Sequence, residues 1–166
     1  RVATGTDVTV KGSFESSVSD PVHFIGNKGN VYVSDSIINT GVAKFFGLNE
    51  GYVHLNGTTT QIVLGTDTIL FNDVEINNTG DTVTIFEVVT KITDTLLMTQ
   101  GNVSLDNSEV ALNTTGVIVD EDNAKRVLGK FGDLTVERSY PSSTLQNDIA
   151  GIGFDGFVVS KVAKYK

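Results

Sequence analysis

Three residues spaced by 22 and 21 positions, Tyr32, His54 and Glu75, carry side chains that together could bind a sugar. Each stands between two aliphatic residues, and neighbouring side chains of a strand point to opposite faces. If the aliphatic side chains point inward, these three point outward. An aromatic ring can then stack on a pyranose, while the imidazole and the carboxylate form hydrogen bonds with its hydroxyls. An ordinary solvated strand face with cross-strand pairs gives the same pattern. The whole outward row is predicted to contain Thr9, Tyr32, His54, Glu75, Ser104 and Thr135.

The groups needed for catalysis are scarce in this chain. Glycoside hydrolysis needs two carboxyl groups held roughly 5 to 10 Å apart, whereas many aspartates, such as Asp35 and Asp106, stand at predicted turns. A lyase would need acidic metal ligands beside an arginine or lysine, and no predicted face collects them. The chain has two histidines, His23 and His54, and no cysteine, so neither a catalytic triad nor a His- or Cys-rich metal site is supported. The sequence therefore predicts that the protein is not an enzyme and uses no cofactor.

One acidic stretch, residues 120–123, contains oxygen groups of the kind that bind calcium. It lacks both the spacing of an EF-hand loop and the nonapeptide repeat of calcium-loaded β-rolls. A solvated acidic loop is the other interpretation, and we predict no metal site.

The elements that would position these side chains recur along the chain. The pattern of an aliphatic residue, any residue and a second aliphatic residue appears six times, with first-to-first steps of 23, 22, 21, 29 and 31 residues. A period in this range is typical of a solenoid, whose stacked units share one continuous core. The six pairs are Val8/Val10, Val31/Val33, Val53/Leu55, Val74/Ile76, Val103/Leu105 and Leu134/Val136.

We therefore expect an all-β fold, a right-handed parallel β-helix (β-solenoid) of about six coils, with roughly 22 residues and three short strands in each. The longer late steps predict insertions at residues 84–98 and 120–130, the second forming a projecting helical turn. A sandwich of hairpins is the alternative, although the strong hairpin signal Asn-Gly between alternating runs occurs only at Asn56-Gly57. Residues 1–140 are assigned to the repeats, and 141–166 to a glycine-rich terminal segment that caps the stack or begins another domain.

Composition excludes several classes of protein. In 166 residues, 39% are hydrophobic and 19% are charged, a balance typical of a globular chain. The net charge of −8 and the scattered lysines and arginines argue against a nucleic-acid partner. No apolar run approaches the roughly 18 to 20 residues that span a bilayer, so membrane insertion is not expected. A chain that starts at Arg1 is expected to be a mature or excised segment.

Three stretches, residues 71–80, 92–103 and 126–138, carry a resemblance to a known group of proteins. The first two resemble the repeats of very large surface proteins exported by Bacteroidetes, and the third is similar to the glycine-punctuated segment that follows such repeats. The similarity extends over roughly residues 69–155. It implies a β-solenoid module of a multidomain adhesin, like those of the gliding-motility and type IX secretion surface proteins, and it brings no catalytic residues.

The resemblance also implies a location and a modification. The module would be extracellular, at the bacterial cell surface, with the flanking domains of the parent protein and a surface polysaccharide as partners. An aspartate followed by a hydroxyl residue and an aliphatic one is similar to the O-glycosylation acceptor of such proteins, although a turn aspartate entering a strand gives the same tripeptide. The acceptors would be Ser36, Thr68, Thr82 and Thr95.

We therefore expect a non-catalytic, stiff structural or adhesive segment. The alternatives are a carbohydrate-active β-helix, either a binding module or a lyase, and a fibre segment that would trimerise.

Overall fold

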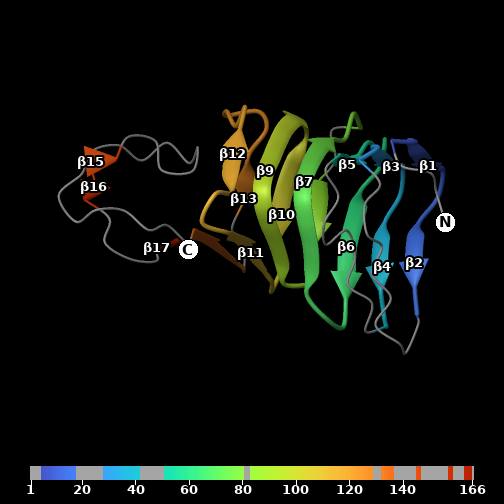
Figure 1. Ribbon diagram of the computed structural model, residues 1–166, viewed down its shortest axis with the longest axis horizontal. Helices are drawn as coiled ribbons and strands as arrows, with labels where there is room; N and C mark the ends of the chain where they lie inside the picture. Colours follow the sequence, from blue (N-terminus) through green and yellow to red (C-terminus); the bar gives the residue numbers. More distant parts are fainter. Residues whose placement is uncertain are drawn as a thin grey trace.

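The computed structural model describes residues 5–17, 28–41, 51–80, 83–128, 132–136, 145–146, 157–158 and 163–165. These residues form strands and turns without a helix, and parallel strands about 22 residues apart stack into a β-solenoid of about five turns (Figure 1). The strands lie across the long axis of the molecule, and successive coils follow one another along it from β1 to β14. The predicted all-β solenoid is confirmed, with about five turns in place of about six.

The strands make three ladders, which we call faces 1, 2 and 3. Face 1 is parallel throughout and includes the second halves of the long strands β7 and β9. Its members in order are β1 (Val8–Val10), β3 (Val31–Val33), β5 (Tyr52–Leu55), β7 (Ile69–Asn77), β9 (Thr90–Gln100) and β12 (Val117–Val119).

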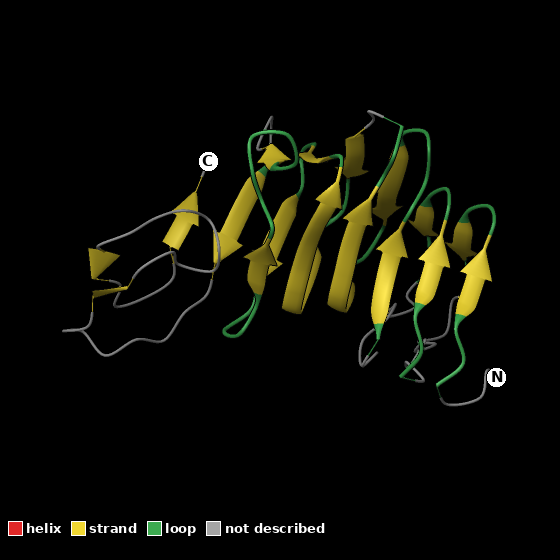
Figure 2. Ribbon diagram, turned by 90° about the horizontal axis from the view of Figure 1, so that it is seen from above, coloured by secondary structure: helices red, strands yellow, loops and turns green. Residues whose placement is uncertain are grey.

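Face 2 is a second parallel ladder, built from the strands that follow the face 1 strands in the chain. Figure 2 shows the sheets as separate rows of strands, joined by loops at the corners. The members of face 2 are β2 (Phe14–Ser16), β4 (Ile37–Asn39), β6 (Gln61–Gly65), β8 (Val83–Phe86), β10 (Asn102–Leu105) and β13 (Val127–Leu128).

Face 3 consists of the first halves of β7 and β9, followed by β11 (Glu109–Leu112) and β14 (Asp133–Val136). The register of β7 against β9 shifts between Phe71 and Asp73, where both strands pass from face 3 to face 1. Strand β17 (Ala163–Tyr165) pairs antiparallel with β14 and ends this face. A separate antiparallel pair joins β15 (Leu145–Gln146) to β16 (Phe157–Val158).

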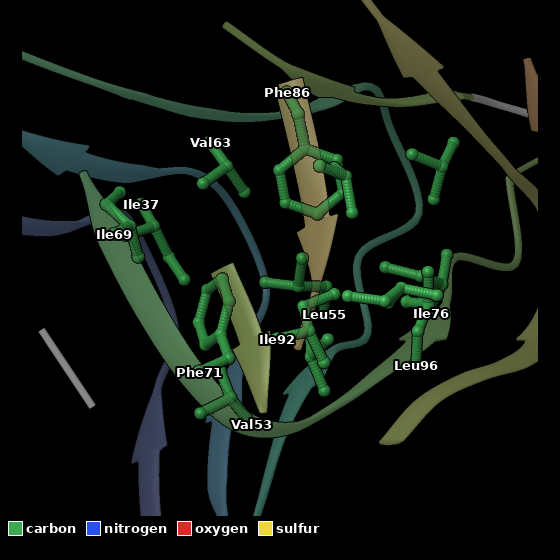
Figure 3. Packing of buried hydrophobic residues seen from close by; sticks show 14 of the residues in the cluster. Ile37, Val53, Leu55, Val63, Ile69, Phe71, Ile76, Phe86, Ile92 and Leu96 are labelled. Carbon is green, nitrogen blue, oxygen red and sulfur yellow. The ribbon is translucent and has the colours of Figure 1, made fainter. Parts of the chain in front are cut away.

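The core fills the space between the three faces. Alternate strand residues point inward and stack on their equivalents in the next coil, as Val53 does on Val74 and Val74 on Leu96. The largest inward side chains, Phe71 and Phe86, are fully buried, and aliphatic residues from neighbouring coils surround them (Figure 3). Each coil therefore buries its apolar side chains against other coils, as expected for a solenoid.

The structure corrects the predicted register of the last two repeat pairs. Val103/Leu105 belongs to β10 on face 2, and Leu134/Val136 belongs to β14 on face 3. Face 1 continues instead through Leu96 and Ile118. Its inward row is Val8, Val31, Val53, Val74, Leu96 and Ile118, with steps of 23, 22, 21, 22 and 22 residues.

The predicted insertions are accordingly wrong. In residues 84–98, β8 and β9 stand in the regular ladders, so nothing is inserted there. The described part of 120–130 forms a tight turn in place of a helical turn, in which Asp122 N donates to Lys125 O at 3.0 Å, and it leads directly into β13. The apparent insertions arose because equally apolar strands on faces 2 and 3 were assigned to face 1.

The corners between faces are closely packed and use glycine and buried amides. A Cβ added at Gly80 would overlap the backbone carbonyl of Thr58 in the preceding coil. At a neighbouring position, the fully buried Gln61 accepts a hydrogen bond from Gly57 N at 2.9 Å and donates to Val33 O and Asp35 O at 3.0 and 2.7 Å. Stacking thus requires specific residues at the corners as well as an apolar interior.

Candidate functional site

The predicted outward row exists over the first four coils. Thr9 pairs directly with Tyr32, Tyr32 with His54, and His54 with Glu75. The row then continues through Leu97 and Val119. Ser104 and Thr135 are not part of it, because they lie on face 2 and face 3.

The rings of this row contact one another along the solenoid axis. The centroids of the Tyr32 and His54 rings are 4.4 Å apart and the two planes are 7° from parallel, which is a stacked arrangement at the inter-strand spacing. Tyr52, two residues before His54 on the same outward side of β5, places its ring 5.8 Å from the imidazole at 35°. The imidazole is therefore bordered by two phenol rings.

Glu75 fixes the imidazole from the next coil. Its Oε2 is bonded to His54 Nδ1, and its Oε1 accepts a hydrogen bond from Thr99 Oγ1. A carboxylate is an acceptor, so Nδ1 carries the hydrogen of the first bond. The side chains of His54 and Glu75 are only 17% and 13% exposed. Three coils are thus linked by one continuous set of side-chain contacts.

The chemistry that this row can perform depends on which of its polar atoms and ring faces remain accessible to a ligand. His54 Nε2 is buried and has no hydrogen-bond partner among the described residues, so it is not positioned to take a proton from a molecule in solvent. One face of Tyr32 covers His54, while the other turns toward the short side chain of Thr9. A ring face beside a small residue is a surface on which a sugar can stack.

The four predicted glycosylation sites lie in different environments. Ser36 is 8% exposed, and its Oγ donates to Asp35 Oδ1 and accepts from Ile62 N. Thr68 is partly exposed at the turn before β7, and Thr95 is partly exposed within β9. Thr82 lies outside the described residues. Attachment of a sugar to Ser36 would require this corner to open.

The carboxylates of the acidic loop bond to their own turn. Asp122 Oδ1 accepts from Ala124 N and Lys125 N at 2.7 and 3.1 Å, and Glu121 Oε1 accepts from Val127 N at 2.9 Å. In the part of the chain that the structure describes, no group of three or more histidine, aspartate or glutamate residues is arranged to hold a metal ion. His23 lies outside that part.

Two features of the surface were missed in the sequence. Tyr52 borders His54, and its position two residues earlier in an alternating strand was a usable signal. A hollow on face 3, lined by Leu70, Lys91, Ala111 and Thr135 among others, had no such signal, because the alignment of β9, β11 and β14 was unknown.

Compared with models of known protein families, with curated proteins and with solved structures, the chain matches none of them. No helix among the described residues is long and apolar enough to cross a membrane. The functional argument therefore rests on the geometry of the solenoid and its surface.

Proposed function

We propose that this chain is a non-catalytic, stiff segment of a large exported cell-surface protein, where it separates flanking domains and takes part in adhesion. The observation that carries the proposal is the continuity of the stack. Face 1 runs from β1 to β12 and face 2 from β2 to β13 with every neighbouring pair parallel. A rod bonded in this way along its length resists bending at any one coil.

The outward row supports the same conclusion. Tyr32, His54 and Glu75 bond to one another across three coils, so they add contacts between coils on the outside of the rod. We propose the cell-surface location and the adhesive role from the resemblance of residues 69–155 to Bacteroidetes surface proteins.

Stiffness can be measured directly, because the chain contains no cysteine to interfere with labelling. Thr9→Cys and Val119→Cys place spin labels in one outward row of face 1, five inter-strand steps apart, or about 24 Å. For a stiff spacer, double electron–electron resonance gives a single narrow distribution of the distance between the two labels. A broad distribution in the folded protein would exclude the spacer function. A Thr9→Cys, Leu97→Cys pair in the same row provides a second distance, which should be shorter by one inter-strand step and equally narrow.

A second candidate function is a polysaccharide-binding module that uses face 1. The stacked pair of Tyr32 and His54, with one face of Tyr32 turned toward Thr9, is the specific observation in its favour. Saturable binding of the purified protein to a polysaccharide panel, lost in Tyr32→Ala and His54→Ala but kept in Val119→Ala, would establish it. Absence of binding to every member of the panel would leave adhesion to other parts of the parent protein.

A further inference from the structure

A hollow of about 180 Å³ lies on the outside of face 3. It is placed on the outward row that pairs Leu70 with Lys91, Lys91 with Ala111 and Ala111 with Thr135. Three of these four side chains are long or branched, whereas Ala111 has only a methyl group. The hollow therefore results from one short side chain between two taller ones, and its width is about two inter-strand spacings, roughly 10 Å.

The walls of the hollow contain polar groups without partners. The side chain of Lys91 is exposed, and its ammonium group forms no hydrogen bond or ion pair with the residues that the structure describes. On the opposite wall, Thr135 Oγ1 is buried and unpartnered within the same set of residues. Because that atom has no exposed surface, a ligand in the hollow does not reach it, and Lys91 is the group that is available to bind.

The remaining lining defines the class of molecule that fits. Ala111 provides an apolar floor between Lys91 and Thr135, while Thr93 and Asn113 add a hydroxyl and an amide at the corner with face 1. The volume is below the roughly 300 to 1,000 Å³ of sites for drug-sized ligands, so it suits a single ring. A pyranose has an apolar face for the floor and hydroxyls for the polar walls, and a carboxylate on it would meet the Lys91 ammonium.

Charge further restricts the ligand. Glu109 and Asp133 are direct partners in the next outward row of face 3, and the chain has a net charge of −8. These negative charges oppose a densely charged polyanion, whereas one carboxylate placed at the Lys91 end of the hollow avoids them.

The geometry points to a binding site for a single acidic sugar residue in the Ala111 hollow of face 3, with the sugar carboxylate on Lys91 and its ring on Ala111. This site is on a different face from Tyr32 and His54. It goes beyond the proposed spacer function and does not depend on it.

The test is a titration of the isotope-labelled protein with methyl β-glucuronide, followed by amide chemical shifts, with methyl β-glucoside as the neutral comparison. We expect saturable shifts at residues lining the hollow for the glucuronide. Lys91→Met should weaken the affinity about tenfold, as expected for loss of one charge-assisted hydrogen bond. Ala111→Leu should abolish the shifts by filling the hollow, whereas Lys125→Met, which removes a lysine outside it, should leave them unchanged.

Several outcomes would overturn the assignment. Equal chemical-shift changes with the glucuronide and the glucoside would show that Lys91 does not bind the sugar carboxylate. Unchanged affinity of Lys91→Met for the glucuronide would show the same. An acidic dipeptide that binds the hollow while the glucuronide does not would show that it accepts a protein side chain. No saturable shift with any of these probes would exclude the site. Ala111 points outward, and a thermal melt of each variant shows whether it is folded.

Discussion

The ring of Tyr32 lies face to face with the ring of His54, with centroids 4.4 Å apart. The two residues are direct partners on β3 and β5, so the spacing of the ladder alone, about 4.8 Å, brings the rings into contact. Glu75 is the next partner in the row and bonds to Nδ1 at the edge of the imidazole ring. Side chains outside the core therefore join successive coils, in addition to the stacked aliphatic residues within it.

This contact should be measurable as a coupling energy. A double-mutant cycle of Tyr32→Leu and His54→Ala should give a coupling of about 0.5 to 1.5 kcal/mol in the free energy of unfolding, the usual contribution of a stacked ring pair. Urea denaturation provides the four free energies. Tyr32→Leu combined with Val119→Ala, on a strand that is not adjacent, should be additive. Additivity of the first pair as well would mean that the rings do not stabilise the fold.

Sequence periodicity was sufficient to predict the fold class and four of the six members of the outward row. The steps from Val8 to Val74 follow face 1, where each coil has one clear alternating strand between turn residues, and the resulting alignment of Tyr32, His54 and Glu75 is the observed one. This success has a simple physical origin. Where each coil has one recognisable strand, the strands can be aligned with one another directly. The alignment of their side chains then does not depend on predicting the conformation of the corners between them.

The alignment failed after Val74 because three faces bury equally apolar strands. In β9 the apolar residues Ile92 and Leu96 belong to different faces, and the strand passes the corner without a glycine or a proline to mark it. A two-residue pattern cannot distinguish Val103 on face 2 from Leu96 on face 1. The face 3 hollow was invisible for the same reason, since Lys91, Ala111 and Thr135 are neighbours only once that register is known.

The corrected register predicts opposite effects for two adjacent leucines. Leu96 is fully buried in the inward row of face 1, whereas Leu97 is partly exposed in the outward row. Leu96→Asn should destabilise the protein by about 3 kcal/mol or more, because it removes apolar contacts and buries an unpaired amide. Leu97→Asn should cost less than about 1 kcal/mol. Chemical denaturation of both variants decides the matter, and equal losses would show that β9 does not have the register described.

Close packing at the corners predicts a strong effect of a single methyl group. A Cβ at Gly80 would overlap the carbonyl group of Thr58, which is backbone and cannot move aside without displacing a coil. Gly80→Ala should therefore lower the free energy of unfolding by about 2 to 3 kcal/mol. Gly12→Ala is the matched control, since nothing lies within 4 Å of a Cβ at that position. We expect it to be neutral or slightly stabilising in thermal melts; similar melting temperatures for the two variants would argue against the stacked corner.

The buried amide of Gln61 provides the last prediction. Its side chain bonds to Gly57 N, Val33 O and Asp35 O and accepts a further hydrogen bond from Asn78 Nδ2 at 3.2 Å. Gln61→Met keeps the length of the side chain but leaves these groups without their partner, at a cost of about 2 to 4 kcal/mol in the free energy of unfolding.

Gln100→Met removes an amide that is exposed at the end of β9, so its cost should stay below about 0.5 kcal/mol. Urea denaturation of both variants measures the difference, and amide hydrogen exchange shows where the damage occurs. Protection of Gly57 N should fall in Gln61→Met even under conditions where the rest of the stack remains folded, because that amide loses its acceptor. If Gly57 stays protected and both variants are equally stable, the corner is closed by apolar packing, and the buried amide does not contribute to it.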